Sequence, residues 1–143
     1  MEDTVLIFEE INIAPLLKEK EAFERALKDT LQVRKEEGES DKFGIFRDAT
    51  IRRFNFTFEL SWRTTKRILG YGQSSVPHLP IDVIRHAAKN EIIDNPTAWF
   101  NFLKMKNQIP EGYKEEVAHQ IFSQLPLFQK ELDKLIEKIL ALN

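Results

Sequence analysis

The segment from Arg47 to Leu69 (RDATIRRFNFTFELSWRTTKRIL) constrains the fold of this chain more than any other. Apolar and polar residues alternate from Phe54 to Trp62, a pattern that is also typical of a half-buried strand. The helical period nevertheless continues on both sides of this centre, and the segment contains no Gly or Pro. Because a strand of this length would be unusual, we predict a helix.

The predicted helix has two apolar faces on opposite sides. One face consists of Ile51, Phe54, Phe58, Trp62, Thr65 and Leu69, which follow one another at steps of three and four residues. The other face consists of Ile45, Ala49, Phe56 and Leu60. Since a single neighbouring layer covers one stripe of a helix, the second face indicates either the centre of a larger bundle or a subunit interface. A chain of 143 residues is short for a large bundle, which favours the interface.

A polar stripe separates these two apolar faces. Asp48 precedes Arg52 by four residues, and Glu59 precedes Arg63 by the same step. An acid placed four residues before a base favours an ion pair on a helix surface. The sequence therefore predicts two ion pairs along this helix.

Length and composition indicate a single domain spanning residues 1–143. The 21 basic and 23 acidic residues give a net charge of −2, so contact with nucleic acid would need a local basic patch. The absence of cysteine excludes disulfides and is compatible with the cytoplasm. The acidic start is unlike a signal peptide, and no apolar run approaches the roughly 20 residues of a membrane span. We expect a cytoplasmic protein.

Helix signals divide the remainder of the chain. Prolines suited to a first helical turn occur at Pro15, Pro80 and Pro96, and glycines or polar clusters lie between the segments. The N-terminal Met1–Asn12 is too short for periodicity to separate strand from helix, and we expect an arm packed on the body. The predicted helices are Pro15–Lys35, a long central helix between the Glu36–Asp41 turn and Gly70, Pro80–Ile92, Pro96–Asn107, and a last helix that starts at EEVAHQIF and whose period runs from Ala118 to Leu142.

The last helix has the clearest hydrophobic period. Steps of three and four residues connect Ala118, Ile121, Leu125, Phe128, Leu132, Leu135, Ile139 and Leu142. Such a seam is typical of an antiparallel bundle. Pro126 interrupts the segment, so a kink or two abutting helices are expected there. The fold class predicted is all-α: an antiparallel four-helix up-and-down bundle with a split third segment and a kinked last helix.

The chain lacks the residue patterns of common catalytic and metal sites. Its histidines, His78, His86 and His119, are scattered, and Asp82 with His86 supplies two ligands where zinc needs three or four. The glycines at Gly70–Gly72 follow a helix rather than a strand and lack the later glycine of phosphate-binding loops. No serine nucleophile arrangement can be identified. We therefore name no metal site and no catalytic residue.

A family resemblance is carried by Arg53-Phe54, Phe56–Leu60 and Trp62. This segment resembles the signature helix of the nucleotidyltransferase substrate-binding proteins, which are small helical partners of minimal nucleotidyltransferases. They belong to the wider HEPN class (higher eukaryotes and prokaryotes nucleotide-binding). The resemblance covers nearly the whole chain and extends through IDVIRHAAKNEIID, AWFNFLKMKN, Tyr113 and EEVAHQIF.

The resemblance implies a bundle that forms a homodimer, in agreement with the second apolar face of the central helix. It also implies association with a separate nucleotidyltransferase subunit, in a two-component, toxin–antitoxin-like pair. Nucleotide and Mg²⁺ would then belong to that partner, and this chain would need no cofactor. Nucleotide binding by this chain is a further implication, and RNA binding stays open.

Related HEPN proteins that cleave RNA carry an arginine and a polar residue and, after a spacer, a histidine, one residue and a tyrosine. These positions align here with Lys106, Asn107, Glu111 and Tyr113. Lysine keeps the positive charge but loses bidentate phosphate recognition. Glutamate cannot act as a cationic acid near neutral pH, as histidine does. We therefore expect no metal-independent RNA cleavage by this chain.

The resemblance also singles out residues of the central helix and one tyrosine. Arg53 and Glu59 are expected to line a groove or to form interface ion pairs, and Trp62 is expected in the core. The family usually has lysine where Arg63 stands. For Tyr113, resemblance to related pairs suggests that the partner transfers AMP onto it, whereas a tyrosine that anchors the loop is an equally open hypothesis.

These inferences predict a non-catalytic substrate-binding or accessory subunit that docks a nucleotidyltransferase. The expected substrate-binding or partner-binding residues are Arg53, Glu59, Arg63, Lys106, Asn107 and Tyr113. Two alternatives stay open: a ribonuclease toxin with a degenerate site, and a stand-alone nucleotide-binding or structural dimer.

Overall fold

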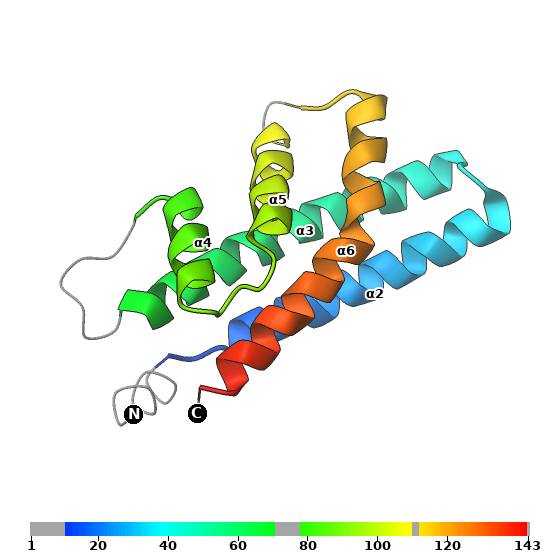
Figure 1. The fold of residues 1–143 in the computed structure, drawn as a ribbon. Helices are drawn as coiled ribbons and strands as arrows, with labels where there is room; N and C mark the ends of the chain where they lie inside the picture. Colours follow the sequence, from blue (N-terminus) through cyan, green and yellow to red (C-terminus); the bar gives the residue numbers. More distant parts are fainter. Residues whose placement is uncertain (1–10, 71–77, 110–111, 143) are drawn as a thin grey trace.

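A computed structural model describes residues 11–70, 78–109 and 112–142, and all of its regular elements in these ranges are helices (Figure 1). The helices are α2 (Ala14–Glu37), α3 (Asp41–Gly70), α4 (Pro80–Lys89), α5 (Pro96–Gln108) and α6 (Glu115–Leu140). This confirms the all-α class. The predicted N-terminal arm up to residue 10, most of the loop after Gly70, and Glu111 lie outside the described residues.

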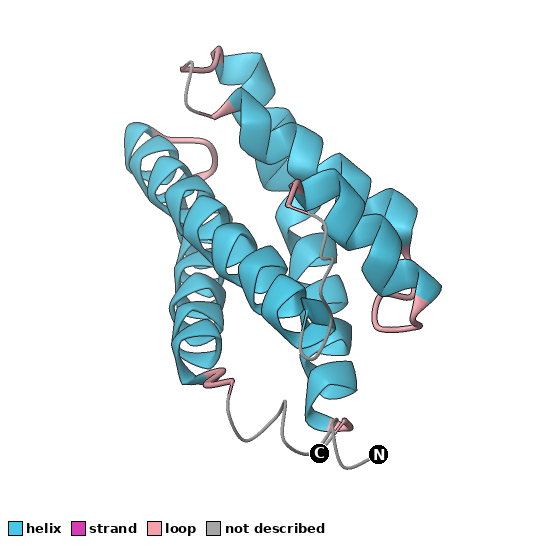
Figure 2. Cartoon of the chain, turned by 90° about the vertical axis from the view of Figure 1, so that its left-hand side faces the viewer, coloured by secondary structure: helices cyan, strands magenta, loops and turns pink. Residues whose placement is uncertain are grey.

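Helix α3 is the element around which the others are arranged. It contacts α2, α4, α5 and α6, and Figures 1 and 2 show α2 running back along it while α6 crosses the pair obliquely. The split of the third segment into α4 and α5 agrees with the prediction. The five helices of the described ranges do not by themselves establish the predicted four-helix up-and-down arrangement, which stays a prediction.

The ends of the helices follow local backbone chemistry. The Asn95 side chain accepts a hydrogen bond from the Ala98 N–H at 3.2 Å, so that α5 begins with the predicted cap and Pro96. The prediction that the preceding helix reaches Ile92 is wrong, because Glu91 adopts a left-handed φ of 62° and α4 ends at Lys89. The turn between α2 and α3 uses Gly38, whose φ of 70° suits glycine.

Helix α3 buries the face that the sequence assigns to the core. Ile51, Phe54 and Phe58 have no exposed surface, Thr65 is 2% exposed, and Trp62 and Leu69 are each 8% exposed. On the opposite side Ile45 is 70% exposed and Phe56 49% exposed. The predicted two-faced helix is therefore present: within the described part of the chain Ile45, Ala49 and Phe56 of its second face are exposed, whereas Leu60 is partly buried against the core.

Phe128 of α6 lies at the centre of the core. Its ring meets those of Phe54, Phe102 and Phe23 edge to face, with centroids 4.8, 5.2 and 5.4 Å apart. Edge-to-face pairs at such distances add to the stabilisation from burial. Through this one side chain, α6 is packed onto α2, α3 and α5 at once.

Pro126 lies inside α6, which continues as one helix from Glu115 to Leu140. Of the two expected alternatives, a kink or two abutting helices, the kink is the one observed: Figure 1 shows a change in the direction of the α6 axis in the orange part of the chain. A proline bends a helix because it removes one amide donor and its ring crowds the preceding turn. The predicted seam is buried from Ala118 to Ile139.

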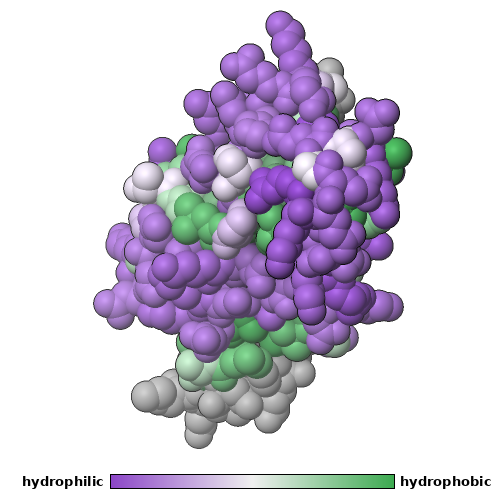
Figure 3. Space-filling view, turned by 90° about the vertical axis from the view of Figure 1, so that its right-hand side faces the viewer, coloured by the Kyte–Doolittle hydropathy of each residue, from purple (hydrophilic) through white to green (hydrophobic). Residues whose placement is uncertain are grey.

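The surface is mostly polar on the side seen in Figure 3, where hydrophobic side chains show between hydrophilic ones and near the lower end. No helix in the described ranges combines the length and apolarity that crossing a lipid bilayer requires.

Candidate functional site

Four side chains meet where α3 faces the end of α5. Glu59 is at the centre: its Oε1 lies 2.5 Å from the Lys106 Nζ, and its Oε2 accepts hydrogen bonds from the Arg63 Nε at 3.1 Å and the Trp62 Nε1 at 3.2 Å. We call Glu59, Trp62, Arg63 and Lys106 the Glu59 cluster. It unites Glu59, Arg63 and Lys106, three of the predicted site residues, from two helices.

The Glu59 cluster is held together electrostatically. Partial burial alone would raise the pKa of Glu59, but the hydrogen bonds from Lys106 and Arg63 outweigh it and lower this pKa below its ordinary value. The Arg63 guanidinium also lies over the Trp62 ring, with its Cζ 5.0 Å from the centroid. One carboxylate therefore positions two cations at the surface.

Replacing Glu59 by glutamine is expected to lower the stability of the protein in a pH-dependent way. Because the pKa of Glu59 falls below its ordinary 4.5 on folding, its contribution is complete above pH 4.5 and is lost as the pH falls through the folded-state pKa. Denaturant unfolding at pH 7 and at successively lower pH should show the difference from wild type shrinking. Glu21→Gln, at an exposed position of α2, serves as the control. A difference that persists unchanged in acid would contradict this account.

A groove opens beside the Glu59 cluster, along the last turns of α3. It has a volume of about 600 Å³ and is lined by Ile11, Leu60, Trp62, Arg63, Lys66, Arg67 and Gly70. We call it the α3 groove. Its floor is apolar and its walls carry three cations, and no carboxylate of the described residues lines it. Its size falls within the range of small-ligand sites.

A second groove lies further toward the start of α3. It has a volume of about 510 Å³ and is lined by Ile45, Asp48, Ala49, Arg52, Arg53 and Phe56. We call it the Phe56 groove. Three of the predicted interface residues therefore lie here, whereas Leu60 lines the α3 groove. Arg53 is not in the Glu59 cluster, since it faces Glu19 of α2 at 3.5 Å.

Tyr113 lies just before α6 and contacts Asp48, one of the residues that line the Phe56 groove. It is partly buried, and its hydroxyl is 3.5 Å from the Asp48 Oδ1. Burial and the negative charge of Asp48 raise the pKa of Tyr113. Asp48 also accepts a hydrogen bond from the Arg47 Nε at 3.1 Å, and this contact takes the place of the predicted ion pair with Arg52.

Sequence reasoning missed Arg47 and Glu115. Arg47 is only 5% exposed and makes a two-pronged ion pair with Glu115, with Nη2 and Oε2 3.0 Å apart. This geometry raises the pKa of Arg47 and lowers that of Glu115. A signal was present, because Arg47 stands four residues before Ile51 and so continues the buried face of α3.

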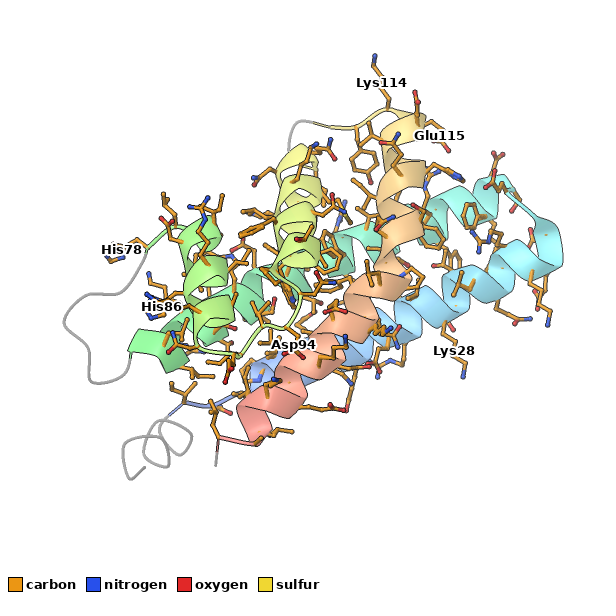
Figure 4. The ribbon with its side chains drawn as sticks, in the orientation of Figure 1. Lys28, His78, His86, Asp94, Lys114 and Glu115 are labelled. Atoms are coloured by element: carbon orange, nitrogen blue, oxygen red, sulfur yellow. The ribbon has the colours of Figure 1, made fainter. Side chains whose placement is uncertain are left out.

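The remaining candidates do not converge. Asn107 is exposed at the end of α5, and His119 is 3.6 Å from Glu39. His78 and His86 lie at the α4 end of the molecule, away from Lys114 and Glu115 (Figure 4). Asp82 pairs with Arg85 at 3.3 Å rather than with a histidine. Among the described residues no three His, Asp or Glu side chains are grouped as a metal site requires.

Comparison with known proteins identifies the family of this helical scaffold. Residues 18–141 match the family described as "Nucleotidyltransferase substrate binding protein like". The chain belongs to this family. The match includes α3, α4, α5 and α6 and all four residues of the Glu59 cluster. The predicted resemblance is thereby confirmed.

Structural comparison supports the fold of this substrate-binding family member. A crystal structure of a protein from Thermus thermophilus matches with a TM-score of 0.65 and 24% sequence identity. The match covers 82% of this chain and 98% of that chain. At this identity the likeness establishes the fold alone. The search of curated proteins finds no match to the chain.

Proposed function

We propose that this protein is a non-catalytic, substrate-binding accessory subunit of a two-component minimal nucleotidyltransferase, in a toxin–antitoxin-like pair. The Glu59 cluster carries the proposal, because it fixes Arg63 and Lys106 at one surface of a chain that belongs to the substrate-binding family. Positioned cations suit the recognition of phosphate or carboxylate groups. The nucleotide and its Mg²⁺ would be held by the partner subunit.

Nucleotidyl transfer by the partner, followed as pyrophosphate release from ATP, tests this function. The partner to use is a small nucleotidyltransferase from the same genome. Adding the wild-type chain is expected to increase the rate of transfer, whereas the chain alone should release none. A rate that does not change when the chain is added would contradict an accessory role.

The exposed apolar face of α3 supports a homodimer as part of this proposal. Ile45, Ala49, Phe56 and Leu60 would be covered by the same face of a second copy, as in the self-complementary interface of a twofold dimer. Leu60→Glu is expected to yield monomers, because it places a charged carboxylate in the apolar contact between the two copies. Light scattering reports the mass. Leu127→Glu, at a 37% exposed position of α6, should leave the dimer intact, and a dimeric Leu60→Glu variant would refute the interface.

We further propose that Tyr113 accepts AMP from the partner. Its hydroxyl is near Asp48, whose carboxylate can orient it and accept its proton during attack on the α-phosphate of ATP, with pyrophosphate leaving. Incubation with the partner and ATP should add one AMP to Tyr113, which mass spectrometry of peptides detects. Asp48→Asn is expected to slow the modification. Unmodified Tyr113 beside an active partner would remove this role.

A further inference from the structure

The α3 groove has a surface chemistry of its own. Leu60, Ile11 and Trp62 supply apolar contacts, while Arg63, Lys66 and Arg67 supply positive charge. Cations four residues apart on a helix lie on one side of it, so Arg63 and Arg67 line the same wall. A ligand that fits this groove has an apolar body with negative charge beside it.

One segment of this chain has that complementary chemistry. Residues 1–10 (MEDTVLIFEE) contain the apolar run Val5–Phe8 with two acidic residues on either side and no Lys or Arg. Overall the chain has a net charge of only −2, so this clustering of acids is a local feature. The complement of the α3 groove is therefore encoded in the same chain, immediately before a residue that lines the groove.

The connection to the groove is direct. Ile11 lines it and Ile13 is 8% exposed in the core, so the chain reaches the body beside the groove. Ten extended residues span up to roughly 33–36 Å, whereas the helical stretch from Leu60 to Gly70 is about 15 Å long. The segment is long enough to lie along the whole groove.

We propose that residues 2–10 occupy the α3 groove of their own chain, with Val5–Phe8 on the apolar floor and the flanking carboxylates beside Arg63, Lys66 and Arg67. The docked segment covers Arg63, assigned above to substrate or partner contacts, and Leu60, assigned above to the dimer interface. It therefore acts as an autoinhibitory arm that competes for this end of α3. The docking of residues 2–10 is argued from the α3 groove alone. Its competition with the partner subunit rests on the proposed function.

Disulfide trapping in the full-length chain tests the docking, because the wild-type sequence contains no cysteine. The reporter pair is Thr4→Cys with Arg67→Cys. The matched control is Thr4→Cys with Lys28→Cys, which also removes one cation; Figure 4 shows the Lys28 side chain extending from α2 away from the other helices. An arm held in the groove has a high effective concentration there, so the reporter pair should form its intramolecular disulfide at least about tenfold faster than the control.

The charge contribution is tested by adding Glu9→Lys and Glu10→Lys to the reporter pair, which should slow trapping toward the control rate. Equal rates for reporter and control would overturn the docking. Disulfide-linked dimers in place of the intramolecular product would also overturn it, because the arm would then occupy a second copy. Circular dichroism of each variant verifies that the helices are intact.

The consequence for partner binding is measured with the same reporter pair. Oxidised protein, with the arm locked over Leu60 and Arg63, should bind the nucleotidyltransferase about tenfold more weakly than reduced protein. Equal affinity of the two forms would overturn the competition. If neither form binds the partner, the proposed function fails, whereas the trapping rates still decide the docking.

Discussion

Replacing Phe128 by alanine is expected to lower the free energy of unfolding by about 3–5 kcal/mol, the usual cost of truncating a buried phenylalanine. The side chain has no exposed surface and contacts aromatic rings from three other helices. Its removal leaves a cavity where α2, α3, α5 and α6 meet, which the surrounding helices cannot close without moving apart. Denaturant unfolding followed by circular dichroism measures the effect.

Phe56→Ala is the matched control for this prediction. Phe56 is 49% exposed on the outer face of α3, and measured at a concentration where the chain is monomeric it should change the unfolding free energy by about 0.5 kcal/mol or less. Similar costs at the two positions would contradict the assignment of one face of α3 to the core and the other to the surface.

Replacing Lys106 by alanine is expected to weaken binding of the nucleotidyltransferase roughly thirtyfold, which corresponds to about 2 kcal/mol. Lys106 is paired with Glu59 and only 22% of its side chain is exposed, so it is held in place at the surface of the Glu59 cluster. Removing it deletes one cation and also releases Glu59 from its closest partner. Isothermal titration with the purified partner measures the affinity.

Lys104→Ala, an exposed position on the same helix, removes the same charge outside the Glu59 cluster and should change the affinity less than twofold. Equal losses for the two variants would indicate a general effect of charge and contradict a specific site. The same Lys106→Ala protein also tests the ribonuclease alternative. RNA cleavage by wild type that is lost in this variant would favour a degenerate nuclease over an accessory subunit.

The part of the fold that was predictable from the sequence is the burial of one periodic apolar face of the central helix α3. The residues from Ile51 to Leu69 on the inner face of α3 are buried as the spacing indicates, because burial follows the helical period. The start of α5 was also predictable, because Asn95 is a common helix cap and Pro96 suits the first helical turn. The end of α4 was misplaced although Asn90 was an available signal, since asparagine commonly ends a helix and its side chain here donates to the His86 carbonyl at 2.8 Å.

For the Glu59 cluster, the sequence predicted which residues belong to the site better than it predicted the contacts between them. The spacing of Glu59 and Arg63 indicated their ion pair, which is present at 3.1 Å. The contact from Lys106 joins residues distant in sequence, and only the packing of α5 against α3 creates it. The ion pair of Arg47 with Glu115 likewise joins residues distant in sequence and depends on the packing of α6 against α3. The available signal was a charged residue, Arg47, within the apolar face of α3.

The accessory-subunit account is tested most directly by co-expressing this chain with a minimal nucleotidyltransferase from the same genome and measuring the mass of the purified product. The account predicts a stable complex of defined stoichiometry that persists at moderate salt and contains both chains. Purification of this chain by itself across a range of salt concentrations, with a folded and active nucleotidyltransferase eluting separately, would contradict it.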